Sequence, residues 1–132
     1  MIRQSLDAGV ALQFLLADDP EKYAKVEKLL RQPDVRFEIA DSAIMEMVFV
    51  MENYYKFTRA QVEKALSILD KVDNMCYNRN LFHLVMKEYL DNPKLSFGEC
   101  CLAKYAGLNE AVPLWTFDKN LAKQSLEAEE IK

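Results

Sequence analysis

The hydrophobic positions of the chain follow two spacings, one typical of strands and one typical of helices. In "DVRFEIAD" the apolar residues Val35, Phe37 and Ile39 alternate with polar residues, which predicts a short strand. Three other segments also favour strands: the run before Asp7, "VDNMCY" and "AVPLWTFD". Helix-like segments separate these four strand candidates along the chain.

Helical spacing dominates the rest of the sequence. Asp19 and Pro20 are typical of an N-cap and a first helical residue, and the apolar residues after them recur at helical spacing until Pro33. Thr58 and Gln61 form a capping-box pattern ahead of another helix. The remaining helix candidates are "VALQFLLA", "SAIMEMVFVMENYY", "NLFHLVMKEYL", the segment from Ser96 to Gly107, and "KNLAKQSL". Because "SAIMEMVFVMENYY" is apolar nearly all round, we expect it to be buried on most of its circumference.

Strands that are separated by one or two helices favour a parallel sheet covered by helices on both faces. We therefore expect an α/β, Rossmann-like three-layer fold with a central, mainly parallel sheet, formed by a single domain over residues 1–132. In such folds, ligands bind beyond the carboxyl ends of the strands. Asp7 ends the first strand candidate and Asp118 ends the last, so both belong to this edge.

Composition and charge limit the classes of function. The 132 residues carry a formal net charge of -4, and the sequence pI is near 5.1. Binding of nucleic acid by bulk electrostatics needs clustered Lys and Arg, so any contact with nucleic acid must be local. The one short block of like charge, "EAEE", is interpreted as a solvated tail.

No targeting or membrane segment is expected. Glu46 and Asp70 interrupt the longest apolar runs, which leaves no stretch suited to crossing a membrane. The first residues lack the basic and apolar regions of a signal peptide, and an odd number of cysteines with Cys100 and Cys101 adjacent suits reduced thiols. We expect a cytoplasmic protein.

Four acidic residues are candidates for a functional site, and three of them also have a structural explanation. Asp7 and Asp118 each precede a predicted helix, where Asp is a favoured N-cap. Ser96 and Glu99 form an S-x-x-E capping box, in which the Glu side chain reaches back to the backbone N–H of the cap residue. For these three acids, the sequence alone does not distinguish a helix-capping role from a role in a functional site.

Glu46 is the fourth candidate and the opposite case. It lies in the middle of "SAIMEMVFVMENYY", away from either helix end, so capping does not explain it. A carboxylate among apolar residues must be paired, coordinated or protonated. This pattern favours a functional role for Glu46, because such groups cluster at sites.

Other common catalytic arrangements lack their residues. His83, the single histidine, is expected to be a partly buried structural residue, so Ser-His-Asp and Cys-His sites have no base. The three cysteines lack C-x-x-C spacing, which argues against zinc, and no glycine-rich phosphate-binding motif occurs. Carboxylates remain, and an all-oxygen set suits Mg²⁺ or Mn²⁺. Hydrolysis of a phosphodiester is the chemistry that such a site favours.

Almost the whole chain resembles a PIN domain, and within that superfamily it is most similar to the VapC-type toxins of bacteria. The matching stretches are "SLDAGVALQFLLADDPEKYAKVEKLL", "IADSAIMEMVFVMENYYKFTRAQVEKAL", "LSFGECCLAKYA" and "LWTFDKNLAK", in the order of the family. The resemblance implies a parallel sheet with four acids at its carboxyl edge, Mg²⁺ or Mn²⁺ as cofactor, and endoribonuclease activity on an RNA substrate. It also implies homodimers and inhibition by a VapB-like antitoxin.

The resemblance assigns roles position by position. Asp7, Glu46, Glu99 and Asp118 match the four metal-binding catalytic acids in that order. Supporting roles fall to Ser96 and to Thr116, which matches the threonine of the usual Thr-Phe-Asp. Two departures stand out: Asp7-Ala8-Gly9 replaces the common Asp-Thr-Asn, and Ser96-Phe97-Gly98-Glu99 replaces the common Asp-Phe-x-Asp.

Two hypotheses from different classes follow. The first is a metal-dependent ribonuclease in which the four acids bind the ion and local cations such as Arg59, Lys104 and Lys119 meet the RNA backbone. Taken singly, each of these cations is better explained as part of the solvated face of a helix. The second is a PIN-fold module without catalysis that acts through RNA or protein binding, as the departures suggest. A haloacid-dehalogenase-like phosphatase is a distant third, because Gly9 stands where that chemistry needs a second Asp.

Overall fold

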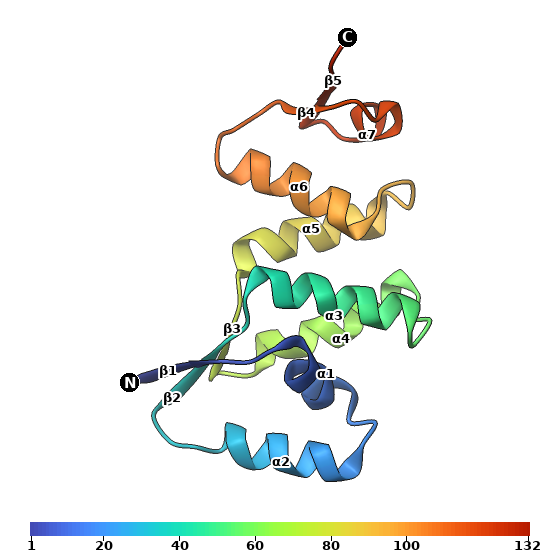
Figure 1. The fold of residues 1–132 in the computed structure, drawn as a ribbon. Helices are drawn as coiled ribbons and strands as arrows, with labels where there is room; N and C mark the ends of the chain where they lie inside the picture. Colours follow the sequence, from blue (N-terminus) through green and yellow to red (C-terminus); the bar gives the residue numbers. More distant parts are fainter. The chain divides into compact units, whose positions relative to one another are not determined.

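The computed structural model describes residues 1–132 and divides into two compact units, residues 1–78 (unit 1) and residues 79–132 (unit 2). Figure 1 shows the elements of both units along the chain. Each unit is described by itself below. None of the helices has the length and apolar character needed to cross a membrane.

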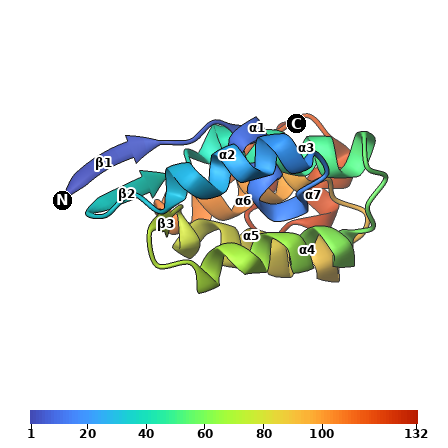
Figure 2. The ribbon, with the colours of Figure 1, turned by 90° about the horizontal axis from the view of Figure 1, so that it is seen from below.

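Unit 1 contains a three-stranded parallel sheet in the order β1-β2-β3. Its strands are β1 (Ile2–Ser5), β2 (Val35–Glu38) and β3 (Met75–Cys76). Ile2 pairs with Val35, Ser5 pairs with Glu38, and Phe37 continues the ladder to Met75. Figure 2 shows the three strands at one end of the helices of this unit. The three strand predictions in this half of the chain are confirmed.

Helices connect these strands in the way that a parallel sheet requires. Between β1 and β2 lie α1 (Ala8–Leu16) and α2 (Pro20–Leu30), and between β2 and β3 lie α3 (Asp41–Asn53), α4 (Arg59–Ser67) and the 3₁₀ helix η1 (Ile68–Lys71). The predicted caps are present: the Asp19 side chain caps α2, and Thr58 with Gln61 forms the capping box of α4. The side chains of Phe37, Ile44 and Met75 are almost completely buried in the core.

Unit 2 contains two long helices followed by a two-stranded parallel sheet. Its elements are α5 (Arg79–Asp91), α6 (Phe97–Leu108), β4 (Leu114–Thr116), α7 (Lys119–Gln124) and β5 (Ala128–Glu130). The helices α5 and α6 pack on each other through Phe97, which stacks on Phe82 at a centroid distance of 6.2 Å and meets the edge of Tyr89 at 5.2 Å. The α/β class with parallel strands flanked by helices is therefore confirmed, with its strands divided between one sheet in each unit.

The acidic "EAEE" block is a strand, and the prediction of a solvated tail is wrong. Its residues lie in and beside β5, where Leu114 is paired with Ala128 and Thr116 with Glu130. The backbone N–H of Leu114 donates to the carbonyl of Glu127 at 2.7 Å. Backbone pairing does not require apolar side chains, so a strand rich in carboxylates cannot be recognised from its charge pattern.

The predicted burial of α3 on most of its circumference is also wrong. Ile44, Met47, Val48 and Met51 form one buried stripe at positions i, i+3, i+4 and i+7, whereas Phe49 on another face is 64% exposed. Glu46 is exposed as well, so it is not a carboxylate enclosed by apolar side chains. A helix with apolar residues on several faces can pack through a single stripe of them. The apolar side chains on its other faces then stay exposed unless further elements cover them.

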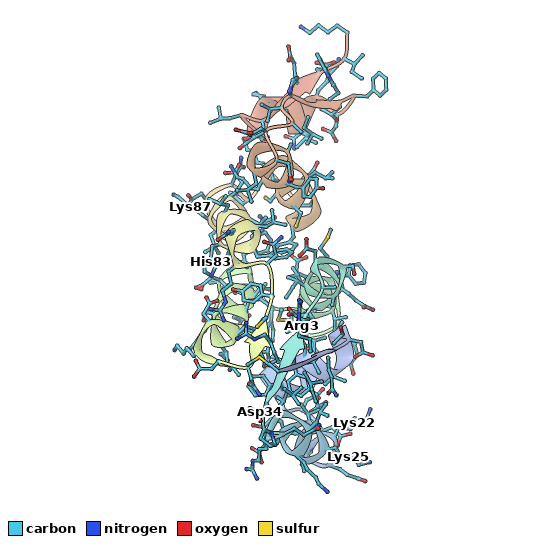
Figure 3. The ribbon with its side chains drawn as sticks, turned by 90° about the vertical axis from the view of Figure 1, so that its left-hand side faces the viewer. Arg3, Lys22, Lys25, Asp34, His83 and Lys87 are labelled. Carbon is cyan, nitrogen blue, oxygen red and sulfur yellow. The ribbon has the colours of Figure 1, made fainter.

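His83 is exposed, which corrects the prediction of a partly buried residue. The buried stripe of α5 consists of Leu81, Phe82, Val85 and Tyr89. His83 lies off this stripe and on the same side of α5 as Lys87, one turn away (Figure 3).

Candidate carboxylate site

Asp7 lies directly beyond the carboxyl end of β1 and caps α1. Its Oδ1 accepts a hydrogen bond from the backbone N–H of Val10 at 3.0 Å, and its side chain is exposed. Beside it, the space at Gly9 is open, since an added Cβ would meet only Asp7 Oδ1, at 3.5 Å. The capping explanation of Asp7 is thus confirmed, and the open backbone beside it leaves its carboxylate accessible.

Glu46 belongs to the same unit and lies one and a half turns into α3. Because β1 and β2 are parallel and Ser5 pairs with Glu38, Asp7 and the start of α3 lie at the same edge of the sheet. Glu46 projects from an exposed part of α3, in line with Val50 and Tyr54 at steps of four residues. Unit 1 therefore presents two solvent-exposed carboxylates on elements that leave the same sheet edge.

Glu99 and Ser96 form the predicted capping box at the start of α6. The backbone N–H of Ser96 donates to Glu99 Oε1 at 2.9 Å, and the backbone N–H of Glu99 donates to Ser96 Oγ at 3.1 Å. Glu99 is half-buried beside the fully buried Cys100. The capping role of this pair is confirmed.

Asp118 repeats the arrangement of Asp7 in unit 2. It follows β4, and its Oδ1 accepts from the backbone N–H of Leu121 at 2.9 Å, which caps α7. Thr116 fixes the turn, because its Oγ1 accepts from the backbone N–H of Asp118 at 2.9 Å. The Asp118 side chain is thereby oriented by its own cap and by the threonine two residues before it.

The donor chemistry of these acids fits a hard divalent cation. Each cap uses one carboxylate oxygen of Asp7, Glu99 or Asp118, and a carboxylate has a second oxygen with further lone pairs for other partners. Oxygen ligands of this kind are those that Mg²⁺ and Mn²⁺ prefer. Asp7 and Glu46 belong to unit 1 and Glu99 and Asp118 to unit 2, and neither unit by itself brings together three such side chains as a metal site.

Comparisons with known proteins do not assign a family. No protein-family model matches the sequence, and no curated protein matches it. Among solved structures, the chain is similar to a chain of VapBC2 from Rickettsia felis, whose crystal structure was determined with a DNA fragment from the promoter. The alignment covers 100% of both chains, with 13% sequence identity and a TM-score of 0.36. A TM-score this low establishes neither a shared fold nor a shared function.

One of the three cations expected to meet RNA is neutralised inside its own unit. Lys104 Nζ lies 2.8 Å from Glu127 Oε1 and 3.9 Å from Glu88 Oε2, and its side chain is only 21% exposed. The Lys104 side chain is thus paired with acids of its own unit, and its contact with RNA stays a prediction. Its position within α6 gave no indication that two acids from other elements of unit 2 would surround it.

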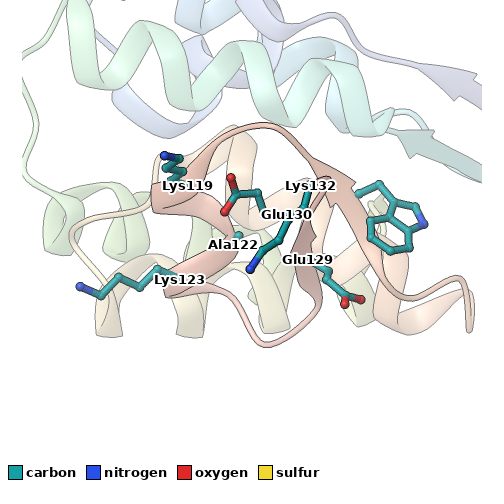
Figure 4. A pocket seen from close by; sticks show the side chains of 7 residues that line it. Lys119, Ala122, Lys123, Glu129, Glu130 and Lys132 are labelled. Carbon is teal, nitrogen blue, oxygen red and sulfur yellow. The ribbon is translucent and has the colours of Figure 1, made fainter.

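Lys119, by contrast, is exposed and lines a cavity of unit 2. Cationic and anionic side chains line this depression of about 660 Å³ (Figure 4), together with one exposed indole. Its lining residues are Trp115, Lys119, Ala122, Lys123, Glu129, Glu130 and Lys132. The two carboxylates offset much of its positive charge, so it is a weak site for a polyanion.

Sequence reasoning missed a groove in unit 1 that begins at Asp7. Two adjoining cavities of about 380 and 340 Å³ share Gly9, Gln13 and Lys22, and together they run over α1 between α2 and α3. One contains Asp7 and Lys25, and the other contains the paired tyrosines at the end of α3. We call this combined depression the α1 groove. It joins residues that are distant in sequence, so no local motif could have revealed it.

A hydrogen-bond network fixes one wall of the α1 groove. The Tyr55 hydroxyl donates to Asp18 Oδ2, and Gln13 Nε2 donates to Asp18 Oδ1 at 2.9 Å. Gln13 Oε1 in turn accepts from the backbone N–H of Asp19 at 3.0 Å. The hydrogen bond to Asp18, aided by burial, raises the pKa of Tyr55 to about 12, and the hydrogen bonds from Tyr55 and then Gln13 lower the pKa of Asp18.

Proposed function

We propose that this protein is a metal-dependent endoribonuclease of the VapC toxin type. The observation that carries the proposal is the repeated placement of an exposed carboxylate directly after a parallel strand. Asp7 follows β1 and Asp118 follows β4, and each is held by a cap hydrogen bond on one oxygen. This is the strand edge where α/β folds bind ligands, and both residues match acids of the PIN-domain pattern.

The chain's residues have distinct roles in this proposal. Asp7, Glu46, Glu99 and Asp118 supply the oxygen ligands for Mg²⁺ or Mn²⁺. When bound, the ion neutralises the carboxylates and stabilises the charge that develops on the phosphate during attack by water. Thr116 and Ser96 act as positioning residues, since their hydroxyls hold the backbone of Asp118 and Glu99 through hydrogen bonds.

The proposal extends to partners and location. A VapC-type toxin of this kind acts on RNA in the cytoplasm, forms a homodimer and is inhibited by a VapB-like antitoxin. A neighbouring reading frame that encodes a small protein with a DNA-binding fold would support the antitoxin. That protein should co-purify with this chain as a complex. Sedimentation of the purified chain at two or more concentrations tests the homodimer.

A cleavage assay tests the enzyme directly. The wild-type chain is incubated with structured RNAs in Mg²⁺, in Mn²⁺ and in chelator, beside the variants Glu46→Gln and Asp118→Asn. We expect cleavage that needs the ion and falls by at least about a hundredfold in either variant, because each removes one charged ligand. Both substitutions leave the shape of the side chain unchanged, and Asn retains capping ability, so lost folding is not the expected cause. Cleavage that persists in chelator, or in both variants, contradicts the proposal.

A second candidate, a PIN-fold module that binds without cleaving, is favoured by one observation. The side chains of Asp7, Glu99 and Asp118 are each accounted for by a helix cap, so their presence does not require a metal. Gly9 also removes the polar side chain that the family pattern places beside the first acid. This alternative predicts RNA binding without cleavage at any concentration of Mg²⁺ or Mn²⁺.

A further inference from the structure

We propose that Asn120 is a positioning residue for the proposed reaction, which holds the turn that carries Asp118 against the loop that precedes Glu99. The inference rests on the proposed function for what the two acids do. For how the acids are held, it rests on hydrogen bonds within unit 2, to which all three residues belong.

One side-chain hydrogen bond joins the two segments that carry these acids. Asn120 lies in the first turn of α7, two residues after Asp118, and its Nδ2 donates to the carbonyl oxygen of Lys94 at 3.1 Å. Lys94 precedes Ser96, which forms the cap of α6 together with Glu99. Each cap joins residues only three positions apart, so it orients its own carboxylate without setting the separation of the two. Asn120 bridges 26 positions of the chain and ties the two caps to each other.

The loop that accepts this bond is itself anchored to α7. The backbone N–H of Lys94 donates to Asn92 Oδ1 at 3.2 Å, and Asn92 Nδ2 lies 3.3 Å from both the carbonyl oxygen and Oε1 of Gln124, at the end of α7. Leu95, the next residue of the loop, is completely buried. Both ends of α7 are therefore bonded to the loop, so the loop does not shift away from α7 unless these bonds break.

A metal site is more sensitive to this tie than the fold is. Mg²⁺ demands near-ideal octahedral geometry with oxygen ligands at about 2.0–2.1 Å, so a small displacement of one carboxylate weakens binding. Residues that orient metal ligands typically contribute about 10- to 100-fold to the affinity for the ion. A single exposed hydrogen bond contributes little to stability, because water replaces it when it is lost. Removal of the Asn120 amide should therefore weaken ion binding and leave the chain folded.

Asn120→Ala and Asn109→Ala form a matched pair of variants. Asn109 Nδ2 also donates to a backbone carbonyl, that of Tyr105 at 2.8 Å, and it lies at the opposite end of α6 from Glu99. In calorimetric titration of the full chain, we expect Asn120→Ala to weaken Mn²⁺ binding about tenfold and Asn109→Ala to leave it within about twofold. Urea unfolding should give similar stabilities for the two variants. Asn120→Gln retains the amide donor and should recover part of the affinity.

Amide hydrogen exchange, followed by NMR in chelator, measures the tie without any ion. The backbone N–H of Leu121 donates to Asp118 Oδ1 and reports the cap of α7. The backbone N–H of Ser96 donates to Glu99 Oε1 and reports the cap of α6. Asn120→Ala should speed exchange of both amides about threefold or more, since each cap loses the segment against which it is held. The matched control should change neither amide, and a merely local role of Asn120 in α7 would change Leu121 alone.

The results distinguish this inference from the proposed function. Unchanged Mn²⁺ affinity or unchanged Ser96 exchange in Asn120→Ala overturns the positioning role, and so does an equal loss of affinity in Asn109→Ala. If the wild-type chain binds no Mn²⁺ and cuts no RNA, the proposed ribonuclease fails. Joint acceleration of the Ser96 and Leu121 amides in Asn120→Ala would then still show that Asn120 ties the two caps.

Discussion

Tyr55 and Asp18 link the stability of unit 1 to pH. The pKa of Tyr55 is raised to about 12 by its hydrogen bond to Asp18, so the folded chain keeps this proton at higher pH than the unfolded chain does. Its contribution to stability is full below the unfolded value of 10.0 and is lost as the pH rises through about 12. Asp18 behaves in the opposite way. Its contribution to the stability of the folded chain is present above pH 3.8 and is lost as the pH falls through its lowered pKa.

The Tyr55→Phe variant tests this coupling. We expect the phenolate absorbance of the wild type to include one tyrosine that titrates near pH 12 and is absent from the variant. The free energy of unfolding of the wild type should fall more steeply between about pH 10 and 12 than that of the variant. Asp18→Asn should move the same titration toward lower pH, since it removes the charged acceptor. An unchanged tyrosine titration in Asp18→Asn contradicts the assignment.

Of the cationic side chains in unit 2, Lys104 is the one whose removal should lower the free energy of unfolding most. Lys104→Met leaves Glu88 and Glu127 facing each other without a counter-charge, at positions where little solvent reaches them. We expect a loss of about 2 kcal/mol, measured by urea unfolding. The control, Lys87→Met, breaks an exposed pair with Asp91 and should cost no more than about 0.5 kcal/mol. Adding Glu127→Gln to Lys104→Met should recover part of the stability; no recovery would show that lost packing is responsible.

Among the elements, helix caps were predictable because their signals span only three or four residues. Asp19 with Pro20, and Ser96 with Glu99, cap α2 and α6 as their sequence patterns indicated. Burial was not predictable in the same way, because it depends on which elements cover a helix. Glu46 is exposed for this reason, despite its apolar neighbours in sequence.

The caps also allow the structural and proposed chemical roles of Asp7 to be separated. Asp7→Asn keeps an oxygen that can accept from Val10, whereas Asp7→Ala removes the cap. We expect Asp7→Ala to lose about 1 kcal/mol of stability relative to Asp7→Asn. Both variants should lose metal-dependent cleavage, because neither has a charged ligand. Full cleavage by Asp7→Asn would leave Asp7 with a capping role only.

At the scale of the whole molecule, the strand and helix pattern predicted the α/β class and its parallel pairing, and the structure distributes that pairing over two units. The α1 groove and the surroundings of Lys104 were beyond prediction, since each joins residues that are far apart in sequence. The common ion for Asp7, Glu46, Glu99 and Asp118 is a long-range property of the same kind, and it stays a prediction.

The expectation of a single domain over residues 1–132 can be tested by unfolding. The only tryptophan, Trp115, belongs to unit 2, whereas the helical signal in circular dichroism comes from both units. A single cooperative domain gives coincident denaturation curves from tryptophan fluorescence and circular dichroism. A fluorescence transition that is complete before the helical signal begins to fall would instead show two independent folding units.

Calorimetric titration of Mn²⁺ into the wild-type chain, Glu46→Gln and Asp118→Asn tests the central claim most directly. The central claim is that these two carboxylates are ligands of a bound divalent ion. The account predicts that the wild type binds Mn²⁺ and that each single variant, although folded, loses this binding. Absence of binding by the wild type at millimolar Mn²⁺, or unchanged binding by either variant, would contradict it.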